Sequence, residues 1–313
     1  MEKVLELIKK YNKIIIFGHV RPDGDCIGSQ YGLYNIIKSS FKEKEVYISG
    51  DVSEYVSFIG RPQIQNISYK DALGICVDTA NSDRVSDQRY TECDYLIKID
   101  HHPNVDDFCD YSVVNTKAPA CAEILTDFYL KFDELKLNKE GALALYVGIL
   151  TDTGRFKFDS VTSNTFYVAS KLLEFGLDLG YIDNNLSIES IESLKLRGYC
   201  LENFKTTENG FAYIVMKRET IEKYKVSDED AANQVTSIST IKGYPVWAMF
   251  IEYPQEIRIR LRSRGPVINI LAEKYNGGGH AKASGARLDS WSDLDKFLND
   301  VDLLVKEYKE KNE

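Results

Sequence analysis

Short apolar runs alternate with longer amphipathic stretches through the first half of the chain. The apolar runs predict buried strands, and the stretches with helical spacing predict helices. The strands are expected at 14–18, 73–77 and 95–99, and the helices at 1–10, 27–39, 120–132, 139–150 and 162–175. This alternation is typical of an α/β fold with a mainly parallel sheet flanked by helices.

The second half has a different order of elements, which predicts a smaller α+β domain. We expect a strand at 211–216, a helix from about Ser227, strands at 244–253 and 256–264, and helices at 267–275 and from Ser292 to about Tyr308. Segment 183–195 is polar, lacks clear periodicity and is the best candidate for a linker. The predicted domains are residues 1–182 and 196–313, with a cleft between them that the linker lets open and close.

Composition narrows the class of protein. The chain has 313 residues, 43% of them hydrophobic and 28% charged, which is typical of a soluble globular protein. The longest apolar runs are too short to span a bilayer, and the N-terminus lacks a secretory pattern. The six cysteines stand singly, so we expect buried thiols in a reducing cytoplasm and no disulfides.

The net charge of −9 is unevenly distributed. Residues 1–186 contribute −8 and residues 187–313 contribute −1, and within the second half residues 231–288 carry +5. An acidic half and a locally basic stretch suit a small anionic substrate held against metal ions. They suit long duplex nucleic acid poorly, because its binding needs an extended cationic surface.

All four histidines lie in short polar motifs. His19 begins a motif with two aspartates, His101 and His102 follow Asp100, and His280 ends a run of glycines. The candidates for metal chemistry are His19, Asp23, Asp25, Asp78, Asp100, His101, His102 and Asp152. His19, Asp78 and Asp100 come at the carboxyl ends of predicted strands, where parallel sheets bind ligands. Carboxylates with a few imidazoles suit Mn²⁺, Mg²⁺ or Fe²⁺, and two such ions activate water for in-line attack on phosphorus.

Each motif also has a plainer interpretation. Asp23 and Asp25 flank Gly24 and follow Pro22, a combination common in turns. Asp78 could cap a helix. Three titratable groups at 100–102, directly after a buried strand, are harder to explain without a ligand. The coincidence of all these motifs in one chain favours a metal site.

These motifs resemble those of the DHH phosphoesterase family, in particular its two-domain, NrnA-like bacterial oligoribonucleases. The matching segments are 19–29, 77–80, 100–103, 148–153, 261–263 and 277–285. The resemblance implies one manganese ion on His19 and Asp23, and another on Asp25, His101 and Asp152. It also implies that Asp78 bridges the ions, that Asp100 orients His101, and that His102 faces the scissile phosphate. Asn276 departs from the family, in which a fourth glycine is common.

The C-terminal motif suggests a phosphate clamp. Backbone N–H groups of Gly277, Gly278 and Gly279 could approach an anion closely, and His280 and Arg262 could donate charge-assisted hydrogen bonds. Ser263 belongs to the same candidate site. Arg258, Arg260, Arg262 and Arg264 alternate with apolar residues and should share one strand face. The alternative is a loop that ends a helix, because glycine is common there.

The resemblance implies hydrolysis of very short RNA to 5′-mononucleotides, and of pAp to AMP and phosphate. The closest alternative is a phosphodiesterase for cyclic di-AMP or pApA with the same mechanism. A pyrophosphatase, a longer RecJ-type exonuclease and a non-catalytic nucleotide-binding module are less favoured. The sequence leaves open the preferred substrate, the direction of RNA degradation, the metal, and whether the protein is a monomer or a homodimer.

Overall fold

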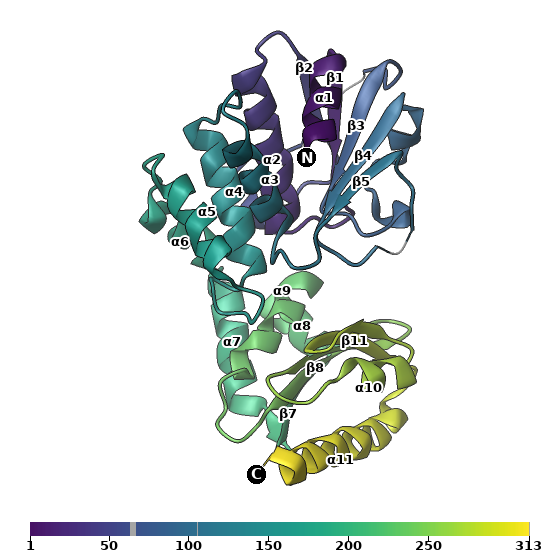
Figure 1. Ribbon diagram of the computed structural model, residues 1–313. Coiled ribbons are helices and arrows are strands. Elements are labelled where there is room, and N and C mark those ends of the chain that lie inside the picture. Colours follow the sequence, from purple (N-terminus) through teal and green to yellow (C-terminus); the bar gives the residue numbers. More distant parts are fainter. Residues whose placement is uncertain (63–66, 105, 313) are drawn as a thin grey trace. The chain divides into compact units, whose positions relative to one another are not determined.

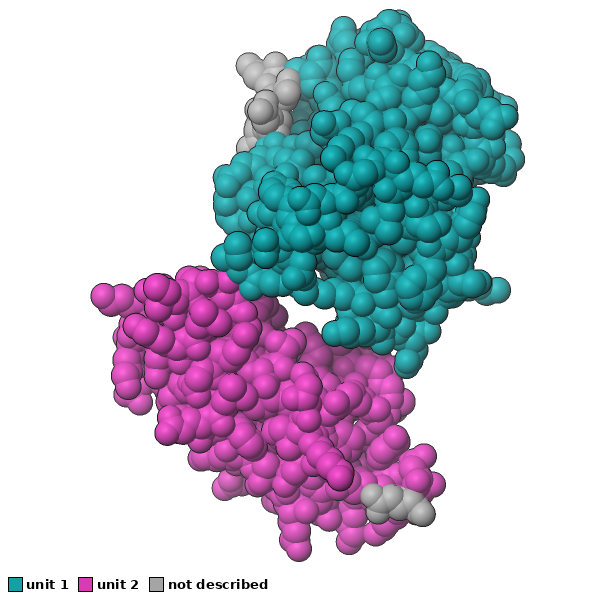
Figure 2. Space-filling view, turned by 90° about the vertical axis from the view of Figure 1, so that its left-hand side faces the viewer, with its two compact units in different colours: residues 1–188 teal, residues 189–313 magenta. Residues whose placement is uncertain are grey.

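The computed structural model describes residues 1–62, 67–104 and 106–312. The chain forms two compact units, Met1–Ile188 and Glu189–Glu313, coloured separately in Figure 2. Their boundary lies within the predicted linker, 183–195. Most of that segment is helical, because α6 (Leu179–Ser187) ends and α7 (Ile191–Asn203) begins within it. Asp178 and Ser190 cap these two helices.

A parallel sheet forms the centre of the first unit. Among the described residues it has five strands, in the order β2-β1-β3-β4-β5. The strands are β1 (Lys13–Phe17), β2 (Glu45–Ser49), β3 (Ala72–Val77), β4 (Tyr95–Asp100) and β5 (Tyr111–Val114). The predicted α/β class and the three predicted strands are confirmed. The two outer strands were missed, because their side chains are partly exposed and form no continuous apolar run.

Helices pack on one face of this sheet, where Figure 1 shows α2, α3 and α4. The helices are α1 (Glu2–Lys10), α2 (Gly24–Ser40), α3 (Cys121–Lys131), α4 (Lys139–Asp152), α5 (Ser163–Leu173) and α6. Ile14 and Ile16 point into the core beneath them. Ile15 and Phe17 point to the other face, which Tyr69 and other side chains from irregular segments cover. Burial on both faces explains the continuous apolar runs of the central strands.

The second unit contains a mixed sheet, with six strands in the described part of the chain, in the order β10-β11-β9-β8-β7-β6. The strands are β6 (Lys205–Thr206), β7 (Phe211–Met216), β8 (Val246–Glu252), β9 (Ile257–Ser263), β10 (Gly278–His280) and β11 (Ala283–Leu288). The helices are α7, α8 (Arg218–Tyr224), α9 (Asp228–Asn233), α10 (Asn269–Lys274) and α11 (Leu294–Asn312). The predicted α+β class is therefore confirmed.

Two local interpretations of the second unit are wrong. The glycine run is not a loop that ends a helix: Gly278–His280 forms the edge strand β10, paired with β11. Ser292 does not cap the last helix but lies within a 3₁₀ turn, Trp291–Asp293, that Ser290 caps. The described residues contain no helix with the length and apolar character needed to span a membrane.

Two glycines allow α2 and α4 to touch through their backbones. A Cβ atom on Gly28 would lie 2.5 Å from the carbonyl oxygen of Ala144 and 2.9 Å from the backbone of Gly148. A Cβ atom on Gly148 would lie 3.0 Å from Oδ1 of Asp25. Asp25 is on the first turn of α2 and Asp152 is the last residue of α4, so this contact brings two candidate ligands together.

We expect Gly28→Ala to lower the free energy of unfolding by about 1–3 kcal/mol, because the added methyl group overpacks a backbone contact. Urea denaturation measures this change. Gly198→Ala is the control: Gly198 lies inside α7, and a Cβ atom there would meet nothing within 4 Å. That variant should be stabilised by about 0.5–1 kcal/mol. Equal effects of the two substitutions would contradict the close helix contact.

Candidate metal centre

Imidazoles and carboxylates from four segments meet at the carboxyl ends of β1, β3 and β4. Nε2 of His19 lies 3.5 Å from Oδ2 of Asp78 and 3.8 Å from Oδ2 of Asp23. Nε2 of His101 lies 3.3 Å from Oδ1 of Asp78 and 3.3 Å from Oδ2 of Asp152. Asp78 therefore presents opposite oxygens to two imidazoles, which is the arrangement of a bridging carboxylate.

Burial makes this arrangement costly without a cation. Asp78 is 2% exposed, Asp25 0% and His19 4%. Oδ1 of Asp78 and Nε2 of His101 are buried and have no hydrogen-bond partner among the described residues. Buried polar atoms left without a partner cost free energy, and a divalent cation would pair with both. The donor set therefore fits a metal centre.

Backbone carbonyl groups orient the two imidazoles. Nδ1 of His19 lies 2.9 Å from the carbonyl oxygen of Val20, and Nδ1 of His101 lies 3.3 Å from that of Ala118. If each Nδ1 carries the proton, it donates to the carbonyl oxygen and leaves Nε2 as a lone-pair donor facing the carboxylates. This is the usual orientation of a metal-binding histidine.

The two aspartates of the first motif also cap helices. Oδ1 of Asp23 accepts a hydrogen bond from the backbone N–H of Cys26 and caps α2, so the turn interpretation of this motif is wrong. The other oxygen of Asp23 faces His19. Asp25 accepts hydrogen bonds from the backbone N–H groups of Cys121 (2.6 Å) and Ala122 (2.9 Å) at the start of α3. Its Oδ2 still lies 3.9 Å from Nε2 of His101.

Asp78 caps no helix, because Asn81 caps the 3₁₀ turn that follows it. Its backbone has φ of 51°, a left-handed conformation that costs about 1 kcal/mol or more for a residue with a side chain. A hydrogen bond from its N–H to the carbonyl oxygen of Ile99 (3.0 Å) helps to hold it there. The fold thus keeps Asp78 in a conformation that directs its carboxylate into the cluster.

Asp100 orients a different histidine from the one expected. Its Oδ1 accepts hydrogen bonds from the ring Nδ1 of His102 (2.9 Å) and from the backbone N–H of His101 (2.8 Å). The expected pairing of Asp100 with the ring of His101 is therefore wrong. The chain folds back over the carboxylate directly after β4, which places the second histidine ring against it. Among the described residues, no hydrogen bond involves Nε2 of His102.

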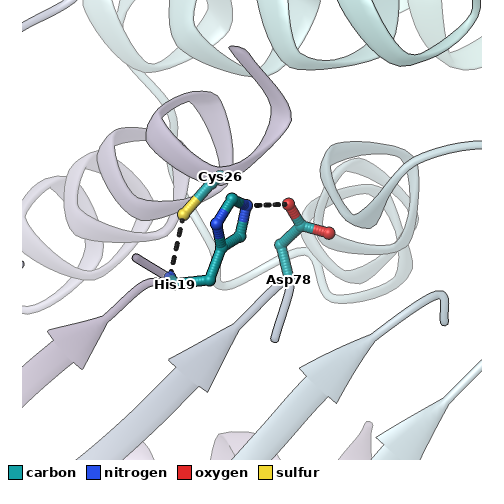
Figure 3. A group of neighbouring side chains, drawn as sticks. All are labelled: His19, Cys26 and Asp78. Atoms are coloured by element: carbon teal, nitrogen blue, oxygen red, sulfur yellow. Dashed lines mark hydrogen bonds and ion pairs between the residues drawn. The ribbon is translucent and has the colours of Figure 1, made fainter. Parts of the chain in front are cut away.

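Cys26 belongs to the cluster and was not predicted. Its Sγ accepts a hydrogen bond from the backbone N–H of His19 (3.3 Å), as Figure 3 shows, and Asp78 lies close by. Burial raises the pKa of the Cys26 thiol to about 11, so the thiol stays protonated near neutral pH. Its observed contact is with the His19 backbone. In the sequence, Cys26 could have been recognised as part of the cluster because it directly follows Asp25 in the first motif.

Two basic residues near the site were also missed. Nη2 of Arg84 lies 3.3 Å from Nδ1 of His19, and no carboxylate pairs with Arg84 in the ranges that the structure describes. Lys98 is buried, donates to Asn104 and lies 3.8 Å from Oδ2 of Asp100. Neither residue stands in a recognisable motif, so only the folded chain reveals these contacts.

Crowding perturbs the acid–base properties of the cluster. Burial, and then the charge of Asp78, raise the pKa of Asp25 to about 7. Burial, and then the charge of Asp25, raise the pKa of Asp152 to about 9. Burial opposes protonation of His101, but contact with Asp78 and nearby charges raise its pKa to about 10. Without a cation the cluster therefore retains protons that a metal ion would displace.

The candidate clamp residues lie in the second unit, and strand register places two of them together. His280 pairs with Ala283, and Ala283 pairs with Arg262, so all three point to the same face of the sheet. A Cβ atom on Gly278 would meet nothing within 4 Å, so this face is open beside His280. Gly279 has φ of 133°, a conformation that favours glycine. Arg258, Arg260 and Arg262 alternate with buried residues, as predicted.

Ser263 differs from the other candidate clamp residues. It is the next residue along β9 after Arg262, so its side chain points to the opposite face. Its hydroxyl donates to the carbonyl oxygen of Pro266 (2.6 Å) and accepts from the N–H of Gly265 (3.0 Å). In this structure Ser263 stabilises a turn and does not share the face of Arg262 and His280.

Comparison with known proteins agrees with this geometry. Residues 13–149 match the DHH family, N-terminal domain, and residues 208–307 match the DHHA1 domain. The chain is 39% identical over 309 residues to the bifunctional oligoribonuclease and PAP phosphatase NrnA of Bacillus subtilis, covering 98% of this chain and 99% of that protein. A solved structure of an exopolyphosphatase-related protein from Bacteroides fragilis superposes with a TM-score of 0.86 at 26% identity, covering 97% of both chains.

A more distant relative is the cyclic-di-AMP phosphodiesterase GdpP of Bacillus subtilis. It is 27% identical over 312 residues, which are 92% of this chain but 46% of that protein. The chain therefore belongs to the DHH family, with a DHHA1 domain as its second part. Within that family it is similar over its full length to NrnA.

We expect the thermal stability of the protein in EDTA to fall as the pH rises from 6.5 to 9. The raised pKa values of Asp25, Asp152 and His101 mean that the folded state binds more protons than the unfolded state in this interval, so unfolding becomes easier as those protons are lost. Differential scanning calorimetry should show a drop in Tm of several degrees. Added Mn²⁺ should raise Tm more at pH 9 than at pH 6.5, because the ion competes with protons. A metal effect that is independent of pH would contradict these protonation states.

Proposed function

We propose that this protein is a metal-dependent phosphoesterase that hydrolyses very short RNA to 5′-mononucleotides and pAp to AMP and phosphate. The observation that carries the proposal is the buried Asp78 carboxylate, which faces His19 with one oxygen and His101 with the other. Full-length similarity to a relative named bifunctional oligoribonuclease and PAP phosphatase supports this choice of substrates. Residues 1–182 would be the catalytic domain, and residues 196–313, beyond the connecting segment 183–195, would bind substrate.

The proposed cofactors are two divalent cations, with Mn²⁺ favoured over Mg²⁺ or Fe²⁺. His19 and Asp23 would hold one ion, Asp25, His101 and Asp152 would hold the other, and Asp78 would contact both. Such ions polarise a phosphoryl group and lower the pKa of bound water. Oxygen donors outnumber nitrogen donors here, which favours hard cations.

Two side chains would act on the phosphate and the leaving group. Asp100 accepts a hydrogen bond from Nδ1 of His102, so the doubly protonated ring could donate its Nε2 proton to the departing oxygen and remain hydrogen-bonded to Asp100. Arg84 lies beside His19, but Nδ1 of His19 donates to a carbonyl group when Nε2 binds metal, so the guanidinium gains no acceptor there. That leaves Arg84 free to donate to a non-bridging phosphate oxygen, where charge increases in the transition state.

The second unit would hold another part of the substrate. His280, Arg262, Gly278 and Ala283 lie on one face of the sheet. The small residue Ala283 lies between His280 and Arg262, and Gly278 lies beside His280. A phosphate could lie on this face and accept charge-assisted hydrogen bonds from both side chains. Gly279 would shape the strand, and Ser263 would act through the adjoining turn.

The alternative substrates are cyclic di-AMP and its linear product pApA, hydrolysed by the same machinery. Similarity to GdpP supports this alternative, but that relative is more distant and extends well beyond the matched region. A non-catalytic nucleotide-binding module is less consistent with the cluster, because His19, Asp25, Asp78, His101, His102 and Asp152 fall into groups close enough to hold metal ions. Free cysteines and the named relatives favour a cytoplasmic bacterial enzyme, either a monomer or a homodimer.

The proposed activity is tested with pAp, pApA, cyclic di-AMP and RNAs of increasing length, with Mn²⁺ or Mg²⁺. Very short RNA and pAp should have the highest kcat/KM. Asp78→Ala should lower turnover of every substrate more than about a hundredfold, because it removes a ligand shared by both ions. Elemental analysis should show the loss of both metals.

Asp83→Ala is the matched control for Asp78→Ala, because Asp83 is an exposed carboxylate only five residues away along the chain. It should retain both metals and its activity. If the wild-type protein hydrolysed none of these short phosphodiesters, the proposed enzymatic activity would be refuted. A faster reaction with cyclic di-AMP than with pAp or short RNA would select the alternative.

For the clamp, we expect His280→Ala to raise KM for pAp about tenfold and leave kcat nearly unchanged, because a hydrogen bond to a charged phosphate is lost. Steady-state kinetics separate the two constants. His280→Asn, which keeps a donor, should recover part of the affinity. A collapse of kcat at constant KM would instead place His280 at the chemical step and would falsify the clamp.

A further inference from the structure

A hollow of about 410 Å³ lies at one end of the mixed sheet in the second unit. Residues 240–245, which lead into β8, form one wall, and Arg264, which follows β9, forms another. Tyr308 and Lys309 of α11 complete the lining. The roles proposed above for the metal centre and the clamp use none of these side chains.

The lining of the hollow is strongly basic. Lys242, Arg264 and Lys309 contribute three positive charges, and no carboxylate side chain lines the hollow. None of the three pairs with an acidic residue in the described parts of the chain. Arg264 lies over the indole of Trp247, with its Cζ 5.4 Å from the ring centroid, and its Nη2 lies 3.5 Å from the carbonyl oxygen of Ile241. Neither contact neutralises its charge. Unpaired cations around a concavity favour an anionic ligand.

Small residues and aromatic rings shape the same hollow. Gly243 has φ of 86°, and a Cβ atom there would meet nothing within 4 Å, so the space above it is open. A Cβ atom on Gly265 would lie 2.7 Å from the ring of Tyr308, so the ring packs closely against this backbone. Tyr244 and Tyr308 are partly exposed. Partly exposed rings beside cations are the usual surface for the bases and phosphates of single-stranded nucleic acid.

The hollow lies next to the clamp within the same unit. Arg262 pairs with Ala283 and Trp247, and the following pair in the ladder is Val246 with Ser263. The chain neighbours of that pair, Pro245 and Arg264, line the hollow. Arg264 is two residues beyond Arg262, a separation of about 7 Å along an extended chain. Neighbouring phosphates of an extended single strand have a comparable spacing. A strand in which an internal phosphate contacts Arg262 could therefore continue towards Arg264.

We propose that this basic hollow, lined by Lys242, Arg264 and Lys309, binds the next phosphodiester and base of a single-stranded RNA substrate beyond the nucleotide held by the clamp. The inference rests on the proposed RNA hydrolysis. A substrate such as pAp ends at the clamp and gains nothing from the hollow. The hollow would therefore strengthen the binding of short RNA relative to pAp.

The test compares Lys242→Ala/Lys309→Ala with Lys306→Ala/Lys311→Ala. Both double variants remove two positive charges, but Lys306 and Lys311 are exposed residues of α11 that do not line the hollow. We expect the first variant to raise KM for a five-nucleotide RNA about tenfold, leave KM for pAp unchanged, and weaken the salt dependence of RNA binding. The control variant should behave like the wild type with both substrates.

Calorimetric titration of the same RNA in EDTA provides a measurement that needs no turnover. Weaker RNA binding by Lys242→Ala/Lys309→Ala, with normal binding by the control variant, would support the hollow as a binding site. This holds even if the wild-type protein has no activity, a result that would refute only the proposed function. Unchanged RNA affinity in an active enzyme would overturn the hollow and leave the proposed function intact. Equal losses for RNA and pAp, or equal losses in the two double variants, would also overturn it.

Discussion

The structure of the first unit depends on one carboxylate held between two imidazoles. Asp78 is buried, adopts a left-handed backbone conformation and directs an oxygen to each side. Around it, burial and then the neighbouring carboxylate charges raise the pKa of Asp25 and Asp152 well above the usual range. A protein interior tolerates such crowding when cations or protons compensate it. The strand ends and helix starts of the unit are arranged around this requirement.

The backbone does much of the positioning. Gly28 and Gly148 let α2 and α4 touch, which sets the distance between the start of one helix and the end of the other. Asp25 anchors α3 through two N–H groups. Carbonyl groups orient both imidazoles. The geometry of the centre therefore depends on main-chain contacts as much as on the rotamers of its side chains.

Local sequence patterns predicted the central strands, most helices of the first unit and the residues at the strand ends. They succeed because buried strands leave continuous apolar runs, and because parallel strands bring their carboxyl ends to one edge. The outer strands were missed because half-exposed strands such as Tyr111–Val114 leave no such run. The helices at 179–187 and 218–224 were missed because they are short and largely polar.

Contacts between distant residues were beyond the reach of sequence patterns. Nothing local indicates that Arg84 lies beside His19, or that Cys26 holds the His19 backbone. The histidine ring that pairs with Asp100 was misassigned. Two histidines follow Asp100, and the direction in which the chain turns after β4 decides which ring reaches its carboxylate. The glycine run pairs as a strand because a partner, Ala283–Leu288, supplies its hydrogen bonds. Such facts are properties of the folded chain.

The two sides of Asp78 are chemically unequal. Towards His101 lie Asp25 and Asp152, so an ion there would contact three carboxylates, of which Asp25 and Asp78 are buried and Asp152 is 28% exposed. Towards His19 the additional carboxylate is Asp23, whose side chain is 57% exposed. If both sides hold metal ions, as proposed, the ion beside Asp23 would be the more accessible of the two and would exchange with the solvent faster. An enzyme of the proposed kind that needs both ions would then lose activity first through the emptying of that exposed position when free metal is scarce.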